Sequence, residues 1–367
     1  YLRRMMIKKA CLKTVLLICI GIYSAKAQYV SLNSGEIENL KKEMAHCQSC
    51  TAAMQPLLDI AANALSEKPM PIEKIRSEGL LMGTPMKMAT LESVKDATKV
   101  YALAMAYKLS GEKKYLKHAV SFLKAWASVN KASGNPIDET KLEDLFKGYD
   151  LIRSDISLSD RQAIDQWLQT IADAERNSEY TDPKKGTSKN NWNSHRIKIM
   201  AMVAYTIHNE AYYPVIDDEF RAQIEKNLYP DGSGFDFHER DALHYHVYTL
   251  DPLLKAAMTI KRAGGRDFFT YQSPSGASLK KSVDFLVPFA TGEKEHIEFA
   301  NSKARFDRER AKNNEKGYQP AAFHREGAIP TLALAAFFDP DYTKVIDTFK
   351  DKRRSALQLM LNRIMRN

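Results

Sequence analysis

The chain has 367 residues and a formal net charge of +9 at pH 7, from 54 Lys and Arg against 45 Asp and Glu. Six of the basic residues and no acidic residue fall within residues 1–27, so removing them leaves +3 on the rest of the chain. A charge this small indicates no nucleic-acid partner. No Ser-, Pro- or Gly-rich linker divides residues 28–367, which we therefore predict to be one large domain.

Residues 1–27 have the three parts of a secretory signal peptide. A basic start precedes an apolar run at residues 15–22, and Ala-Lys-Ala at residues 25–27 supplies a cleavage site before Gln28. The apolar run is too short to span a bilayer. We expect cleavage before Gln28, no membrane insertion afterwards, and a periplasmic or secreted product.

Four cysteines are present, and two of them, Cys11 and Cys19, lie in the predicted signal peptide. Cys47 and Cys50 remain as one Cys-x-x-Cys pair. In an exported protein this pair is either a local disulfide or two free thiols. A redox motif or a zinc site is the weaker interpretation, because no βαβ pattern surrounds the pair and only His46 lies nearby.

Apolar residues follow helical spacing through most of the chain after residue 28. Stretches near residues 94–104, 116–127 and 164–171 each repeat apolar side chains at intervals of three and four. Gly, Pro, Asn and Asp break the pattern between them, and Ser159-Asp160 is a predicted helix cap. Many amphipathic hairpins must bury their apolar faces against one another. The pattern predicts an all-α fold, an α/α toroid or incomplete barrel.

A first polar cluster, Asn-Asn-Trp-Asn-Ser-His, occupies residues 190–195 and opens a predicted helix that runs to about residue 209. Asn191 and His195 are four residues apart, so their side chains project from one face of the first turn. Each could equally be an ordinary buried residue that hydrogen-bonds within the core.

A second cluster, Arg-Asp-Ala-Leu-His-Tyr-His-Val-Tyr, occupies residues 240–248. If this stretch is helical, Tyr245 and Tyr248 lie one turn apart on one face. Amides and an imidazole in one cluster, with phenols and a guanidinium in the other, indicate proton abstraction next to a carboxylate.

A third polar stretch, residues 301–317, is a charged segment that contains Arg308 and Arg310. It is either a mobile flap over an anionic substrate or a solvated loop.

On the motifs at residues 190–195 and 242–248, the chain resembles the alginate-lyase superfamily of polysaccharide lyases. These are helical toroid enzymes that cleave uronic-acid polymers by β-elimination. The resemblance extends more weakly to residues 126–153 and 319–330. The alginate lyases that it resembles place a histidine where this chain has Trp192 and an arginine where it has Asp241. His195 and Arg240 substitute from neighbouring positions, which suggests another branch, such as the Bacteroidetes-type glucuronan or alginate lyases.

The resemblance implies a set of catalytic roles. β-Elimination removes the C5 proton beside the uronate carboxylate and expels the oxygen at C4, so donors must stabilise the developing charge. Asn191 and His195 are the expected neutralisers. Tyr248 is the expected base and acid, with Tyr245 the second choice, and Arg240 is expected to lower the pKa of the catalytic phenol.

The expected partner is an anionic polysaccharide, with no metal ion and no cofactor. Mannuronan and glucuronan are favoured, because their C5 proton and C4 oxygen lie on one side of the ring and a single phenol can serve both. Guluronate needs two groups, with His195 as the base. The predicted substrate-binding residues are Asn190, Trp192, His244, Tyr245, His246, Arg308, His324 and Arg325.

Three alternatives stay open. A glycoside hydrolase on the same toroid needs two carboxylates, for which Asp236, Glu239 and Asp241 are candidates. A non-catalytic glycan-binding protein would bind the polymer without releasing product. A zinc enzyme built on His238, His244 and His246 is the weakest of the three.

Overall fold

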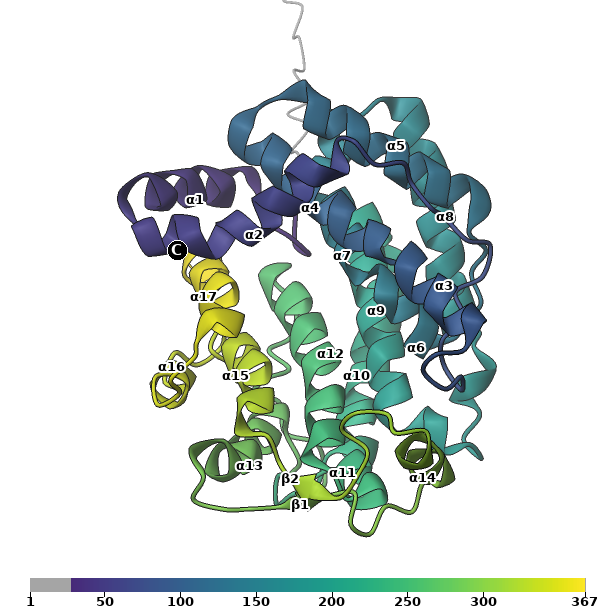
Figure 1. Ribbon diagram of the computed structural model, residues 1–367, viewed down its shortest axis with the longest axis vertical. Helices are drawn as coiled ribbons and strands as arrows, with labels where there is room; N and C mark the ends of the chain where they lie inside the picture. The colour runs from purple at the N-terminus through teal and green to yellow at the C-terminus, as the bar shows by residue number, and fades with distance from the viewer. Residues whose placement is uncertain (1–27, 367) are drawn as a thin grey trace, which may run out of the picture.

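The computed structural model describes residues 28–366, whose regular structure is almost entirely helical (Figure 1). The predicted signal peptide lies outside the described residues. The α-helices are α1 (Ser34–His46), α2 (Gln48–Ala64), α3 (Pro85–Ser93), α4 (Lys95–Ser110), α5 (Lys113–Val129), α6 (Pro136–Glu139), α7 (Glu143–Ile152), α8 (Leu158–Arg176), α9 (Asn191–Ile207), α10 (Tyr213–Asn227), α11 (Phe235–Arg240), α12 (Leu243–Arg262), α13 (Leu279–Thr291), α14 (Arg305–Lys312), α15 (Ile329–Ala335), α16 (Tyr342–Ile346) and α17 (Arg353–Arg366).

The remaining elements are short. Two strands, β1 (Ile297–Glu298) and β2 (Ala321–Ala322), pair antiparallel. Six single turns of 3-10 helix are η1 (Thr140–Leu142), η2 (Arg153–Asp155), η3 (Glu179–Thr181), η4 (Gly186–Ser188), η5 (Glu210–Tyr212) and η6 (Arg325–Ala328) within the described chain.

The longer helices form two concentric layers. In the described chain an inner ring is closed by successive packing of α2, α4, α7, α9, α12, α15 and α17, and α17 returns to α2. Outside it, α1, α5, α8, α10, α13 and α16 each pack on one to three inner helices. This double ring is an α/α toroid, and the predicted all-α fold class is confirmed.

Inner and outer helices differ in how their residues are buried. On the inner helix α9, every residue from Asn193 to Thr206 is buried, whereas the outer helix α5 buries one stripe that ends at Trp126. Inner helices also approach closely: a Cβ on Gly148 of α7 would lie 2.9 Å from the backbone of Tyr101 on α4. Within residues 28–366, no helix combines the length and the apolar composition needed to cross a membrane.

The helix ends can be compared with the helix boundaries and caps that the sequence predicts. The helix predicted from residue 190 is confirmed, since α9 is capped by Asn190 and ends where His208 turns left-handed at φ 58°. The cap predicted at Ser159-Asp160 is wrong by two residues. Ser157 caps α8, because its hydroxyl accepts the Asp160 N–H and its backbone is extended.

The cysteine alternatives are also decided. Cys47 and Cys50 form a disulfide at the start of α2.

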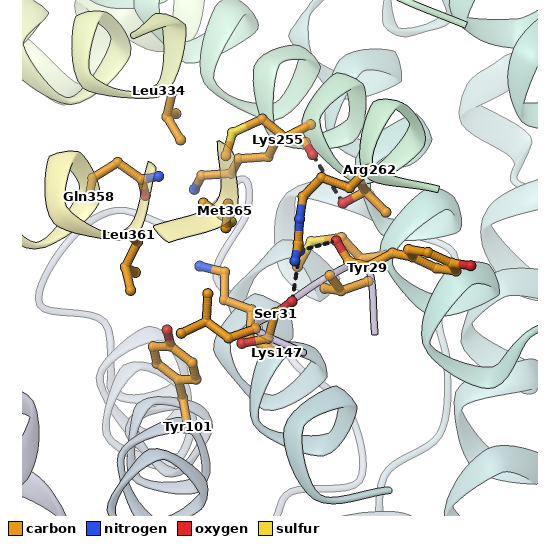
Figure 2. A pocket seen from close by; sticks show the side chains of 15 residues that line it. Tyr29, Ser31, Tyr101, Lys147, Lys255, Arg262, Leu334, Gln358, Leu361 and Met365 are labelled. Carbon is orange, nitrogen blue, oxygen red and sulfur yellow. Dashed lines mark hydrogen bonds between the residues drawn. The ribbon is translucent and has the colours of Figure 1, made fainter. Parts of the chain in front are cut away.

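The segment before α1 closes one end of the ring. The Gln28 amide donates to the carbonyls of Asp150 and Leu151, and Arg262 donates to the carbonyls of Tyr29 and Ser31. Behind this segment lies a cavity of about 80 Å³. Figure 2 shows that lysine, arginine and methionine side chains line it. None of the predicted site residues lines this cavity, so the candidate site must be sought elsewhere.

A buried pair of carboxyl groups joins α6 to α8. Glu175 is 0% exposed, and neither of its carboxyl oxygens has a hydrogen-bond partner among the described residues. Burial and the neighbouring carboxylate of Glu139 raise the pKa of Glu175 well above its ordinary value. Glu139 is held by the backbone N–H of Ser133 and Gly134. Glu175 is therefore expected to be the neutral member of the pair.

In the wild type, the free energy of unfolding should fall at high pH because Glu175 is kept neutral in the folded chain. We predict that Glu175→Gln removes this fall. Below the ordinary Glu pKa, Glu175 is protonated in both folded and unfolded chains. Above it, only the unfolded chain ionises, so the free energy of unfolding falls until pH passes the raised pKa. The variant should be about 1–3 kcal/mol more stable than the wild type at pH 8 and equal to it at pH 4. Urea unfolding at both pH values measures this.

The control is Glu38→Gln, whose side chain is 62% exposed and should not change the pH dependence. Parallel pH curves for wild type and Glu175→Gln would contradict the prediction.

Candidate active site

The first turn of α9 is held by a buried carboxylate. Asn190 caps the helix, its side-chain oxygen accepting the Trp192 N–H at 2.9 Å. Asn191 donates its backbone N–H at 3.1 Å and its Nδ2 at 2.6 Å to one oxygen of Asp236, and Asn227 donates to the other at 2.7 Å. Asn191 is 2% exposed. A contact between Asn191 and a substrate would therefore use only the amide hydrogen that Asp236 leaves free.

His195 lies one turn further along α9. Its Nδ1 is 2.9 Å from the hydroxyl of Thr140, and its buried Nε2 has no hydrogen-bond partner among the described residues. Burial, together with the ammonium groups of Lys198 and Lys255, holds the pKa of His195 well below its ordinary value. The imidazole is therefore neutral near pH 7.

Tyr248 projects from α12 onto this imidazole. The ring centroids of His195 and Tyr248 are 4.5 Å apart, and that of Tyr245 is 6.2 Å from Tyr248 at nearly a right angle. Burial raises the pKa of Tyr248 to about 12, and the positive charge of Arg310 counteracts part of that rise. The structure thus brings together the imidazole and the phenol that the two sequence clusters contribute.

Arg240, predicted to lower the pKa of the catalytic phenol, lies against Tyr245. Its Nε donates to Asp307 at 2.6 Å, and its guanidinium stacks on the ring of Tyr245 at 3.7 Å. Asp307 pairs with this guanidinium, whose charge counteracts part of the rise that burial causes in the pKa of Tyr245. Arg310 donates to the Tyr245 hydroxyl at 3.0 Å and is the guanidinium whose charge lowers the pKa of Tyr248.

Arg310 belongs to a cover segment, which we define as residues 297–322, from β1 to β2. In Figure 1 this segment lies beside α11 and the start of α12. Its Glu315 accepts the backbone N–H of Met82 at 2.7 Å, and Asn313 donates to the Met82 carbonyl at 3.2 Å. The segment contains the helix α14. Because it also bonds to Met82 and Tyr245, it packs across the site and is not a solvated loop.

A groove of about 480 Å³ runs between the cover segment and residues 82–87. Its lining is polar and mixed in charge. The residues are Met82, Gly83, Lys87, Arg310, Asn313, Asn314, Glu315, Lys316 and Tyr318.

A family model described as alginate lyase matches residues 50–296. The chain belongs to the alginate lyase family. It is a polysaccharide lyase, and no curated protein gives a significant match.

Solved structures agree on the fold. An alginate lyase from Bacteroides ovatus superposes with a TM-score of 0.67 at 16% identity, over 91% of this chain and 98% of that one. Alginate lyase A1-III from Sphingomonas species A1 superposes with a TM-score of 0.61 at 14% identity, over 91% and 96%. A variant of the Sphingomonas protein, in which a histidine is replaced by alanine, was crystallised with a tetrasaccharide.

Several residues predicted to bind substrate lie elsewhere in the lyase. His246 is 0% exposed and its Nε2 bonds to the carbonyl of Ser282, so it is a core residue. Arg325 donates to the carbonyl of Ala290, and His324 pairs with Glu326 at 3.2 Å. Those two side chains lie with α13 and η6 and, in the described contacts, touch none of the site residues.

Three further residues were predicted to bind substrate, and the structure shows which side chains each of them contacts. His244 is exposed and lies parallel to Tyr248, with ring centroids 6.4 Å apart. Trp192 is half-buried and packs against Tyr180 at 4.6 Å. Arg308 is exposed and donates to the carbonyl of Ser302, so it faces away from the site tyrosines that Arg310 reaches.

Two of the three carboxylates of the hydrolase alternative, Asp236 and Asp241, are occupied. Asp236 is 2% exposed and accepts from Asn191 and Asn227. Asp241 accepts from the backbone and side chain of Asn301. Neither is placed as a free acid or base. Within residues 28–366, no group of three His, Cys, Asp or Glu side chains is arranged to hold a metal ion, so the zinc alternative lacks a ligand set.

Sequence reasoning missed four residues at the site: Arg310, Tyr318, Thr140 and Lys198. Arg310 and Arg308 both lie in the charged segment of the sequence. They differ only in the face of α14 from which each projects, which the sequence pattern did not reveal. Lys198 lies three residues after His195, a spacing that places two side chains on one helix face and could have marked it. Thr140 and Tyr318 are remote in sequence, and no pattern points to them.

We predict that Arg310→Gln lowers kcat roughly 100-fold, because it removes a positive charge from the phenols at which charge develops. Arg308→Gln, on the same helix but facing solvent, should stay within about twofold of the wild type. The rate of unsaturated product formation measures both. Equal losses in the two variants would show that general attraction of the polymer, and not the placement of Arg310, controls the rate.

Proposed function

We propose that this lyase cleaves a polyuronate whose C5 proton and C4 oxygen lie on the same side of the ring, mannuronan or glucuronan, by β-elimination. The observation that carries the proposal is the ring contact between His195 and Tyr248, with Arg310 as the charge acting on the phenol. The tetrasaccharide bound to the Sphingomonas relative supports a chain-like sugar substrate.

In the proposed reaction, Tyr248 carries the proton. As phenolate it takes the proton from C5, and as phenol it returns a proton to the oxygen leaving C4. With a pKa of about 12, Tyr248 is mostly protonated at neutral pH, which suits the acid step. Its role as base requires stabilisation of the phenolate, and Arg310 supplies positive charge for this. His195 contributes a hydrogen bond to the developing enediolate.

The test is a panel of polymannuronate, polyguluronate, glucuronan and hyaluronan, followed by the ultraviolet absorbance of the unsaturated product. We expect absorbance from polymannuronate or glucuronan. Release of reducing ends without that absorbance would instead indicate hydrolysis, and binding without either product would indicate a glycan-binding protein.

On the polymer that is cleaved, Tyr248→Phe should lower the rate by several orders of magnitude, because it removes the group that serves both proton transfers. Tyr245→Phe is the matched control one turn away and should lose less. The reverse order would assign the proton carrier to Tyr245.

We also propose that the protein is exported to the periplasm or beyond, on the signal pattern of residues 1–27. The mature N-terminus should be Gln28, whose side chain bonds to the carbonyls of Asp150 and Leu151. Mass spectrometry of the exported protein checks this. A mature protein that retained residues 6–27 would disprove it.

A further inference from the structure

Behind His195, a chain of hydrogen bonds runs away from the site into the toroid. The Thr140 hydroxyl lies 2.9 Å from Nδ1 of His195 and 2.6 Å from Nζ of Lys198, and Lys198 also donates to Glu143. Within residues 28–366 the hydroxyl has no other hydrogen-bond partner. The order of atoms is therefore carboxylate, ammonium, hydroxyl, imidazole.

The hydrogens in this chain have one arrangement that uses every group. An ammonium only donates, so the Thr140 oxygen accepts from Lys198. The Thr140 hydrogen is then free to be donated, and Nδ1 of His195 is its only available acceptor. If Nδ1 carried a hydrogen, the hydroxyl would accept twice and its own hydrogen would have no partner in a buried place, which is unfavourable. Nδ1 is thus an acceptor, and the ring hydrogen resides on Nε2.

Burial makes this arrangement persistent. The side chains of Lys198 and His195 are nearly inaccessible to solvent, so water does not compete for the bonds. Burial by itself would raise the pKa of Glu143, but Lys147, Lys198 and Lys255 together lower it well below its ordinary value. Burial lowers the pKa of Lys198 to about 8, which still leaves it charged at pH 7. Glu143 therefore remains an anion that anchors the ammonium.

We propose that Thr140 and Lys198 are positioning residues that hold His195 as the neutral tautomer with its hydrogen on Nε2. His195 then acts as a hydrogen-bond donor to the substrate carboxylate, and it has no free basic nitrogen with which to take the C5 proton. The consequence, which rests on the proposed function, is that polymers requiring a second base, such as polyguluronate, are not substrates. A neutral imidazole donor stabilises a developing oxyanion without placing a full charge in a buried site.

The direct test is nitrogen NMR of the wild-type protein labelled with [15N]histidine, at pH 7, with His195 assigned by comparison with His195→Gln. The two ring nitrogens of a neutral imidazole differ in shift according to which one carries hydrogen. We expect the hydrogen on Nε2. A hydrogen on Nδ1, or an imidazolium, would overturn the proposal whatever the activity.

A test with variants distinguishes the hydrogen bond of the Thr140 hydroxyl from the packing of the Thr140 side chain. Thr140→Val keeps the shape but removes the donor, so His195 should lose its fixed tautomer and kcat should fall roughly 10- to 100-fold with little change in KM. Thr140→Ser keeps the hydroxyl and should restore both the nitrogen shifts and most of kcat. Loss in Thr140→Ser equal to that in Thr140→Val would overturn the proposal.

Two outcomes distinguish this inference from the proposed function. If the expected tautomer is observed but no polymer is cleaved, the hydrogen-bond chain stands and the lyase assignment to polyuronates fails. Rapid cleavage of polyguluronate would show that His195 does supply a base, and this would overturn the inference while the lyase assignment stands.

Discussion

The candidate site depends on one buried carboxylate, Glu143. Its oxygens bind Lys147 within α7, Lys198 on α9 and Lys255 on α12, so a single anion joins three consecutive helices of the inner ring. A buried charge is stable only when it is paired, and removing one partner of such a cluster destabilises a fold strongly. Because α9 carries His195 and α12 carries Tyr248, the same cluster sets the position of the imidazole relative to the phenol.

Hydrogen bonds between uncharged side chains also join α9 to α10 and α12. Ser194 on α9 meets Thr249 on α12 at 2.9 Å, and Gln223 on α10 donates to Ser194 at 3.0 Å. These residues adjoin His195 and Tyr248 in sequence, so each reactive ring has a neighbour that is fixed to the opposite helix. Polar side chains are rare in an ordinary core. Their burial on α9 costs little stability, because nearly all of them have a hydrogen-bond partner. On α9 the exceptions are the hydroxyl of Thr206 and Nε2 of His195, and His195 is the one that lies at the site.

The sequence predicted what local spacing determines. Periodic apolar residues predicted the helices and the toroid, and the four-residue spacing of Asn191 and His195 predicted a shared face. Local spacing does not show what a remote residue does to a candidate side chain. Arg240 pairs with Asp307, which lies 67 positions away, and no local pattern reveals that pair. Likewise His246, two residues after the exposed His244, turns into the core because Ser282 offers it a carbonyl.

The placement of Arg310 links catalysis to the cover segment. This guanidinium packs against Tyr318 of the same segment at 4.7 Å and bonds across to Tyr245 on α12. The segment is held there on two sides. Asp307 accepts from Arg240 and the Phe299 N–H donates to the Asp241 carbonyl, while Glu315 accepts the N–H of Met82. The positive charge beside Tyr248 therefore comes from a segment that is remote from α12 in sequence, and the bonds that fix this segment to α11 also fix the position of that charge.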